Sequence, residues 1–241
     1  MTTFVLVHGH WHGAWCWSRL IPELEAAGHR CIAIELPCTQ RDAGVAENAR
    51  VIEAALEGTD DDVVLVGHSA GGLTIPLVAQ HRPVRHLAFL AALLPIPGMS
   101  LGQQFDEDPS IIDPDFQYID DGDGFCSIDP TLAPRYFYQD CDTGDAAWAT
   151  ARLRPQTTLT ITEATPLQEW PATPRSYIIG DLDRVVRPEW AVRAARERLG
   201  VEALVLKGVG HSPFVSQPGP LASHLSKLAS GQFVGPGATG A

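Results

Sequence analysis

The sequence is poor in basic residues and has no long hydrophobic run. Only 17 of its 241 residues are lysine or arginine, against 29 aspartates and glutamates, which gives a formal net charge of −12. Nucleic acids and anionic membranes bind clusters of basic side chains, so neither is expected as a partner. The chain starts without a basic segment followed by an apolar one, and nothing in it is long enough to span a bilayer. A cytoplasmic protein without a signal peptide is therefore predicted.

Cysteine is also scarce, and the five cysteines are scattered. They form no Cys-x-x-Cys pair and no Cys/His cluster at the spacing of metal ligands, so we expect reduced, mostly structural thiols and no metal site. The sequence Asp-Gly-Asp-Gly at residues 121–124 is compatible with calcium binding. It lacks the closing glutamate of an EF-hand, however, and solvated loop acids are the favoured interpretation.

Short apolar segments alternate with helical ones along most of the chain. This pattern predicts an α/β fold with a six-stranded, mainly parallel, doubly wound sheet, whose ligands bind at the carboxyl ends of the strands. The predicted strands are residues 4–7, 30–36, 63–66, 84–90, 175–179 and 203–206. The predicted helices are residues 14–27, 42–56, 73–80, 188–199 and 221–229.

The alternation stops between residues 95 and 174, where prolines, glycines and acids are concentrated. A long insertion at the edge of the sheet that carries the active site is typical of a cap or lid. We therefore predict a core made of residues 1–94 and 175–230, a cap over residues 95–174, and a flexible tail over residues 231–241. Within the cap, helices are expected at residues 133–138 and 144–153.

The most informative stretch is residues 62–73, DVVLVGHSAGGL. A short β-branched run leads into Gly-His-Ser-Ala-Gly and then into an apolar helix, which is the context that a nucleophile elbow requires. Gly67 and Gly71 remove side chains that would collide in a sharp turn, so the Ser69 hydroxyl is expected to stand clear at the end of the strand. Ser69 is the predicted nucleophile.

A serine hydroxyl needs an imidazole to accept its proton and a carboxylate to orient that imidazole. In this fold the order along the chain is serine, acid, histidine. His211 follows the last predicted strand and is the expected base. Asp181 and Asp183 both follow the fifth strand; we favour Asp183 because it lies further into the loop, whereas Asp181 is placed to cap the turn.

The oxyanion hole is expected to use the backbone N–H of Ala70 and one N–H from the loop after the first strand, where His10 is favoured over Trp11. The imidazoles of His8, His12 and His68 are interpreted as structural. An apolar pocket is expected from aromatic side chains of the first loop and the cap, although each fits plain packing as well. The substrate-binding candidates are Trp11, Phe105, Tyr118, Phe137 and Trp148.

These segments resemble the branch of the α/β-hydrolase superfamily that holds the plant-type methylesterases, the salicylate-binding esterase and the hydroxynitrile lyases. The resemblance is carried by residues 4–30, 66–73, 89–100 and 208–218, with HGAWCW specific to the branch. It implies a cofactor-free serine hydrolase of small esters, commonly a homodimer, with Ser69, Asp183 and His211 as the triad and His10 and Ala70 at the oxyanion positions.

Three positions depart from parts of that branch. His10 stands where a small or aliphatic residue is usual, so its imidazole is expected to narrow the pocket or touch the substrate. S-selective lyases carry threonine and lysine where this chain has Gly9 and Ser212, which disfavours their mechanism. R-selective lyases use a polar side chain at the position of His10, so that mechanism stays open.

The leading hypothesis is hydrolysis of small, neutral, apolar or aromatic carboxylic esters, because an acidic cap repels anionic ones. Two alternatives remain: cyanohydrin cleavage, and a ligand-binding relative with little turnover.

Overall fold

A computed structural model describes residues 1–59 and 62–230; the tail predicted over residues 231–241 lies outside the described residues. Its centre is a six-stranded sheet with the strand order β2-β1-β3-β4-β8-β9. All neighbouring strands in it are parallel, as predicted. The strands are β1 Thr3–Val7, β2 Arg30–Ile34, β3 Val63–His68, β4 His86–Leu90, β8 Arg175–Gly180 and β9 Leu204–Leu206.

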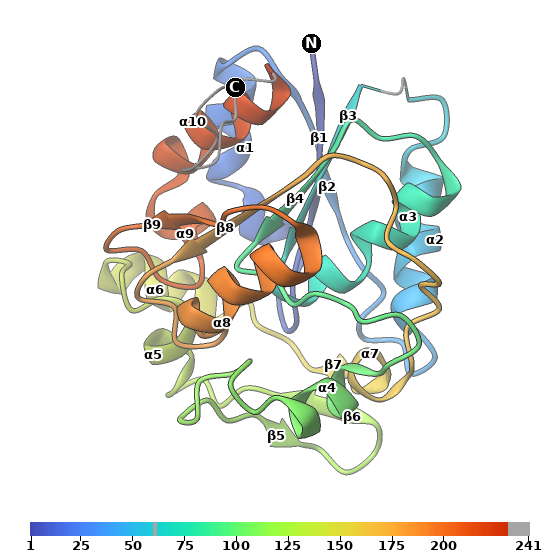
Figure 1. The fold of residues 1–241 in the computed structure, drawn as a ribbon. Helices are drawn as coiled ribbons and strands as arrows, with labels where there is room; N and C mark the ends of the chain where they lie inside the picture. Colours follow the sequence, from blue (N-terminus) through green and yellow to red (C-terminus); the bar gives the residue numbers. More distant parts are fainter. Residues whose placement is uncertain (60–61, 231–241) are drawn as a thin grey trace.

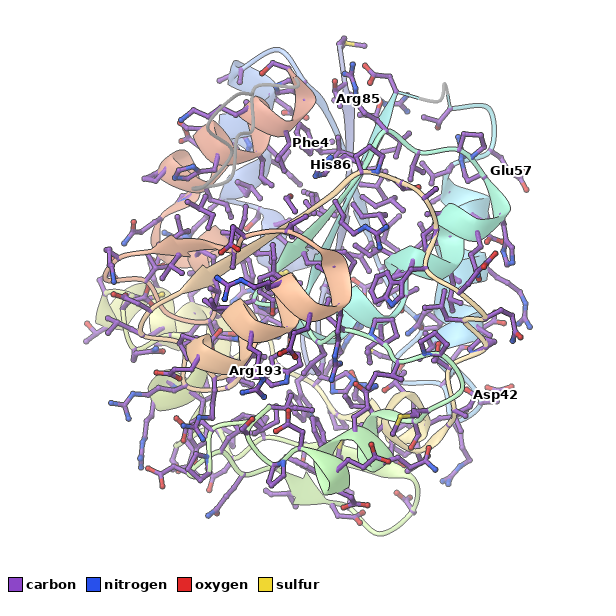
Figure 2. All side chains as sticks on the ribbon, viewed as in Figure 1. Phe4, Asp42, Glu57, Arg85, His86 and Arg193 are labelled. Atoms are coloured by element: carbon purple, nitrogen blue, oxygen red, sulfur yellow. The ribbon has the colours of Figure 1, made fainter. Side chains whose placement is uncertain are left out.

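The inner strands are buried on both faces, which explains their continuous apolar sequence. Phe4 and its three successors on β1 have no exposed surface, and β3 is buried along its whole length. The register pairs Leu6 of β1 with Val66 of β3, and Val66 with Ala88 of β4. Figure 2 shows Phe4 inside the molecule, whereas labelled charged residues such as Glu57 and Arg193 lie at its surface.

Helices cover both faces of the sheet. On one side α1 (Leu20–Ala26) packs against α10 (Pro218–Ala229), and on the other α2 (Val45–Ala55) packs against α3 (Ile75–His81) (Figure 1). Near β8, α8 (Pro188–Ala194) continues into a π-helical turn, η3 (Ala195–Leu199). The sheet and its helices together form the predicted layered architecture.

The helix predicted over residues 14–27 is in fact two segments, a 3-10 turn η1 (Ala14–Trp17) and then α1. Pro22 has no N–H and its ring clashes with the carbonyl four residues earlier, so it is tolerated only in the first turn of a helix. The α-helix consequently begins at Leu20. Similarly, α3 follows a 3-10 turn, η2 (Ser69–Leu73), and has Pro76 in its first turn.

Residues 95–162 lie beyond the carboxyl ends of the strands, whereas residues 163–174 run back past α3 to the start of β8 (Figure 1). The two helices predicted there are present as α5 (Ala133–Phe137) and α6 (Thr143–Thr150). The same segment also contains elements that sequence periodicity did not predict, because each is shorter than the window that periodicity needs. These are α4 (Leu101–Glu107), α7 (Leu159–Thr162) and a three-stranded sheet of β5 (Ile119–Asp120), β6 (Phe125–Ser127) and β7 (Gln156–Thr157).

Among the described residues, no helix combines the length and apolar character that a membrane crossing requires.

Candidate active site

Ser69 lies at the sharp turn between β3 and η2. Its φ of +50° places a non-glycine residue in the left-handed region, which persists only where the surroundings impose it. The turn also demands glycine: a Cβ on Gly67 would lie 2.9 Å from the backbone of Gly71, and a Cβ on Gly71 would lie 2.6 Å from the carbonyl oxygen of Val7. The two glycines therefore let the elbow fold against β1.

His211 and Asp183 form a buried hydrogen-bonded pair. The Nδ1 of His211 is 2.8 Å from Oδ2 of Asp183, and their side chains are 1% and 0% exposed. The other carboxylate oxygen, Oδ1, accepts the backbone N–H groups of Val185 at 2.8 Å and Val186 at 3.0 Å. The carboxylate is thus fixed from one side and directed at the imidazole from the other.

Asp181 has a different role in the same loop. Its Oδ1 accepts the backbone N–H of Gly208 at 2.7 Å, and its Oδ2 is 3.3 Å from Nζ of Lys207. Asp181 therefore joins the loop after β8 to the turn after β9. Of the two candidate acids, the structure brings Asp183 to His211.

His68, the residue before Ser69, links the elbow to the His211 loop. Its Nε2–H donates to the carbonyl of His211 at 3.0 Å, and the two rings have centroids 4.7 Å apart. Burial lowers the pKa of His68 well below its ordinary value, helped by the neighbouring imidazole of His211. His68 is therefore a neutral hydrogen-bond donor that holds the segments of Ser69 and His211 side by side.

Two further neutral histidines fix the loop after β1. His8 donates Nδ1–H to the carbonyl of Gly9 and accepts the N–H of Leu36 on Nε2, an arrangement that only a neutral ring can make. His12 donates Nδ1–H to the carbonyl of His10 and accepts the Tyr138 hydroxyl on Nε2. Burial lowers the pKa to about 4 for His8 and about 3 for His12. This agrees with the structural roles expected for them.

The same loop contains the residues expected at the oxyanion hole. The backbone N–H of Trp11 donates to Oε1 of Gln156 at 3.3 Å, so it is already engaged. His10 lines the cavity beside Ser69, and its Nε2 lies 3.0 Å from the hydroxyl of Thr160. Burial lowers the pKa of His10 to about 3, so its imidazole is neutral. Ala70, directly after Ser69, is buried in the elbow.

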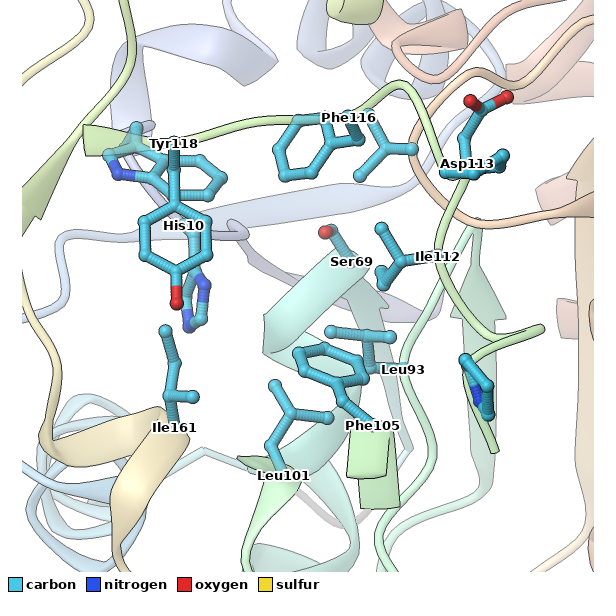
Figure 3. Close-up of a pocket in the computed structure, with 14 residues that line it drawn as sticks. His10, Ser69, Leu93, Leu101, Phe105, Ile112, Asp113, Phe116, Tyr118 and Ile161 are labelled. Carbon is cyan, nitrogen blue, oxygen red and sulfur yellow. The ribbon is translucent and has the colours of Figure 1, made fainter. Parts of the chain in front are cut away.

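A cavity of about 300 Å³ opens in front of Ser69. Figure 3 shows the Ser69 hydroxyl directed into the space between side chains of the first loop and the cap. The lining is largely apolar, and its one carboxylate, on Asp113, points away from Ser69 in this view. The lining residues are His10, Trp11, Ser69, Leu93, Leu101, Phe105, Pro109, Ile112, Asp113, Pro114, Phe116, Tyr118, Ile161 and Val185.

Three of the five substrate-binding candidates, Trp11, Phe105 and Tyr118, line this cavity. The structure places the other two elsewhere. Phe137 is buried behind the lining, with its ring 5.8 Å from that of His211, and Trp148 packs edge-on against Trp15 at 5.4 Å. Both belong to the packing of the cap against the core. Aromatic character alone did not separate these two environments.

The aliphatic part of the lining was missed. Leu101 lies one helical turn before the predicted Phe105 on α4, so both side chains are on one face, and Leu93 follows the carboxyl end of β4. Leu93 was detectable because the residue after a strand of this sheet lies near its ligand edge. Ile161 had no comparable sequence signal, because α7 has only four residues.

Within the described part of the chain, no group of three or more His, Cys, Asp or Glu side chains is arranged to hold a metal ion.

The sequence profile of the alpha/beta hydrolase family matches residues 4–224. The chain is 30% identical to salicylic acid-binding protein 2 of Nicotiana tabacum, over 94% of this chain and 96% of that protein. It is 28% identical to an alpha-hydroxynitrile lyase of Arabidopsis thaliana, with coverage of 94% and 96%. The crystal structure of the methylesterase MES16 from Arabidopsis aligns with a TM-score of 0.77 over 95% of this chain and 99% of that chain; at 24% identity this similarity shows the fold alone.

The chain therefore belongs to the α/β-hydrolase family, and its six-stranded sheet has the α/β-hydrolase fold. Its relatives include plant methylesterases, a salicylic acid-binding protein and a hydroxynitrile lyase, the branch that the sequence resembled.

Proposed function

We propose that this protein hydrolyses small neutral carboxylic esters through an acyl-enzyme formed on Ser69. His211 accepts the proton of the Ser69 hydroxyl and returns it to the leaving alcohol, while Asp183 holds His211 in the tautomer that leaves Nε2 free to accept. Water, activated by the same imidazole, then releases the acyl group. The backbone N–H groups of Ala70 and His10 stabilise the oxyanion.

The observation that carries the proposal is the buried pair of His211 and Asp183, whose loop is joined through His68 to the elbow that holds the strained Ser69. A carboxylate held by two backbone N–H groups and directed at Nδ1 of a buried imidazole is the arrangement that orients a general base. Ser69 opens on the cavity and is joined to the His211 loop through His68. The esterases among the relatives, including the probable esterase PIR7A of rice, support the same reaction class.

The substrate class follows from the lining and the charge of the molecule. A cavity of about 300 Å³ with mostly apolar walls accommodates a small acyl or aromatic group. Asp113 at the cavity and a net charge of −12 disfavour an anionic ester. Neutral esters are therefore the proposed substrates, with a higher kcat/KM than anionic esters of matched size.

The experiment is to measure p-nitrophenyl acetate hydrolysis by Ser69→Ala and by Ser223→Ala, the same change at an exposed hydroxyl on α10. We expect Ser69→Ala to lose at least about 10³-fold in kcat, because no other group supplies the nucleophile, and Ser223→Ala to match the native enzyme. Retained turnover in folded Ser69→Ala contradicts the proposal. Failure of the native protein to react with a fluorophosphonate supports instead a ligand-binding relative without turnover.

Cyanohydrin cleavage is the second candidate, favoured by one observation. His10 places a neutral imidazole in the cavity wall, a polar group that can hydrogen-bond to a hydroxyl-bearing substrate, and a hydroxynitrile lyase is among the relatives. Release of cyanide from mandelonitrile by the native protein, and loss of that release in His10→Leu, supports this activity. If the native protein releases no cyanide, cyanohydrin cleavage is excluded.

A further inference from the structure

Two neighbouring cap residues, Gln139 and Asp140, contact the loops that carry the proposed acid and base. They follow α5 after its C-cap residue, Tyr138. Oδ2 of Asp140 accepts the backbone N–H of Gly210 at 2.8 Å and the hydroxyl of Ser216 at 2.7 Å. Nε2 of Gln139 donates to the carbonyl of Leu182. Each loop is thus contacted one residue before its member of the proposed triad, which is Asp183 in one loop and His211 in the other.

The contacts of Asp140 bracket the segment that contains His211. Gly210 precedes the imidazole, and Ser216 is the last residue of α9 (Pro213–Ser216). One carboxylate oxygen therefore binds both ends of residues 210–216, the segment called the base loop below. Because the acceptor is a carboxylate, both bonds are charge-assisted, about twice as strong as bonds between neutral groups.

Gly210 allows this contact because it has no side chain. A Cβ at Gly210 would lie 2.6 Å from Oδ1 of Asp140 and 2.7 Å from Nε2 of Gln139. Only a residue without a side chain lets both cap groups approach the backbone beside His211 so closely. The close approach brings the cap against the base loop at a position that does not line the cavity in front of Ser69.

The loop that carries Asp183, residues 181–187, is held by further hydrogen bonds that do not involve Gln139. The N–H of Asp113 donates to the carbonyl of Val185 at 2.9 Å, and the N–H of Arg187 donates to the carbonyl of Ile111 at 3.0 Å. Asp183 is also held by two backbone N–H groups within its loop. Loss of Gln139 therefore leaves the acid well fixed. In the base loop, His68 holds the carbonyl of His211, and Asp140 is a cap side chain that hydrogen-bonds to both ends of the loop.

We propose that Asp140 is a positioning residue for His211: its carboxylate ties residues 210–216 to the cap and so aligns the imidazole with Ser69 and Asp183. The inference rests on the proposed hydrolase function. Asp140 touches neither substrate nor reacting atoms, and it acts through the backbone on either side of the base. An imidazole displaced by about 1 Å loses on the order of 10²-fold in rate.

The test compares Asp140→Ala with Asp142→Ala. Asp142 is two residues away, and its side chain caps α6 without contacting either catalytic loop, so its loss affects the stability of the cap. We expect Asp140→Ala to lower kcat by about 10- to 100-fold with KM changed by less than about threefold. Asp142→Ala keeps kcat within about twofold.

A second arm separates positioning from general damage. In the His211→Ala background the base is absent, so Asp140→Ala is expected to cause no further loss of the residual hydrolysis. An equal further loss in that background, or a kcat for Asp140→Ala equal to that of Asp142→Ala, overturns the inference.

If Asp140→Ala does not fold, Asp140→Asn replaces it. The asparagine keeps the shape and one acceptor oxygen, and we expect it to lose about 3- to 10-fold in kcat because the charge is gone. An unchanged kcat in Asp140→Asn overturns the inference. The native enzyme and Ser69→Ala are assayed in parallel. If Ser69→Ala keeps its activity, the proposed function is wrong. If Ser69→Ala is inactive but the Asp140 variant has an unchanged kcat, only the inference about Asp140 is wrong.

Discussion

At the scale of single residues, two carboxylates in one loop have separate roles that their surroundings decide. Asp181 accepts Gly208 N–H and pairs with Lys207 near the surface, whereas Asp183 is buried and reaches His211. Both are aspartates on the same short connection after β8. The difference lies in the groups around each side chain, because a carboxylate orients an imidazole only where backbone N–H groups hold it at the right distance.

This difference predicts opposite results for one substitution at two positions. In Asp183→Asn, the amide oxygen stays with the N–H groups of Val185 and Val186, so the NH₂ faces Nδ1 of His211 and imposes the tautomer that cannot accept the serine proton. We expect kcat to fall by about 10³- to 10⁴-fold. Asp181→Asn keeps an acceptor for Gly208, and its kcat should stay within about threefold of the native value. Comparable losses in ester hydrolysis by the two variants contradict the assignment.

At the scale of elements, the elbow works because β3 and the turn after it lie directly against β1. Gly71 sits above the carbonyl oxygen of Val7, and the carbonyl of Ser69 accepts the N–H of Leu93 at 3.0 Å. The turn is thus held between β1 and the segment that follows β4. These neighbours maintain the left-handed conformation of Ser69, which an isolated peptide would not keep.

Adding one methyl group tests this packing. Gly71→Ala places a Cβ 2.6 Å from the backbone oxygen of Val7, which cannot move without disturbing β1, and we expect a loss of about 2–4 kcal/mol in the free energy of unfolding. Gly144→Ala is the matched control, because its Cβ meets only Oδ1 of Asp142 at 3.4 Å in the first turn of α6. That change should be neutral or stabilising by up to about 1 kcal/mol. Urea denaturation measures both, and equal effects exclude the steric explanation.

At the scale of the whole molecule, four buried neutral imidazoles make the free energy of unfolding depend on pH. His8, His10, His12 and His68 have at most 8% of their surface exposed, and burial lowers the pKa of each below 6.5. In the unfolded chain the same side chains titrate near 6.5. Below that pH the unfolded chain binds protons that the folded chain does not, so acidification favours unfolding. The contribution of these histidines to the free energy of unfolding is fully present above about pH 6.5 and is lost as the pH falls toward 4.

The predicted slope is about 1.4 kcal/mol per pH unit for each such histidine between pH 6 and pH 5. Urea denaturation at several pH values measures the slope. His12→Asn removes one titrating group but keeps a side chain able to donate to the carbonyl of His10, so its slope should be shallower by about one proton. Comparison of the two proteins cancels the change in overall charge. Identical slopes show that His12 is not buried in the neutral form.

Sequence patterns were most informative where the structural requirement is local. The inner strands β1, β3, β4 and β8 were predictable because burial on both faces selects apolar residues, and Ser69 was predictable because an elbow needs glycine on both sides. The cap was predictable only from the loss of the strand–helix alternation. Its short strands and α4 are stabilised by contacts with distant segments, such as the pairing of Phe125 with Thr157.

The sequence by itself determined the order along the chain of the core strands and helices, the elbow at Ser69 and the positions after strands where an acid and a base occur. These features follow from hydrophobic periodicity and backbone sterics, which act over a few residues. Only the tertiary structure decided that Asp183 meets His211, that Phe137 lies behind the pocket, and that Asp140 binds the base loop from the cap. Such contacts join residues far apart in the chain, and only the packing of the cap and loops on the sheet brings those side chains within hydrogen-bonding or ring-contact distance.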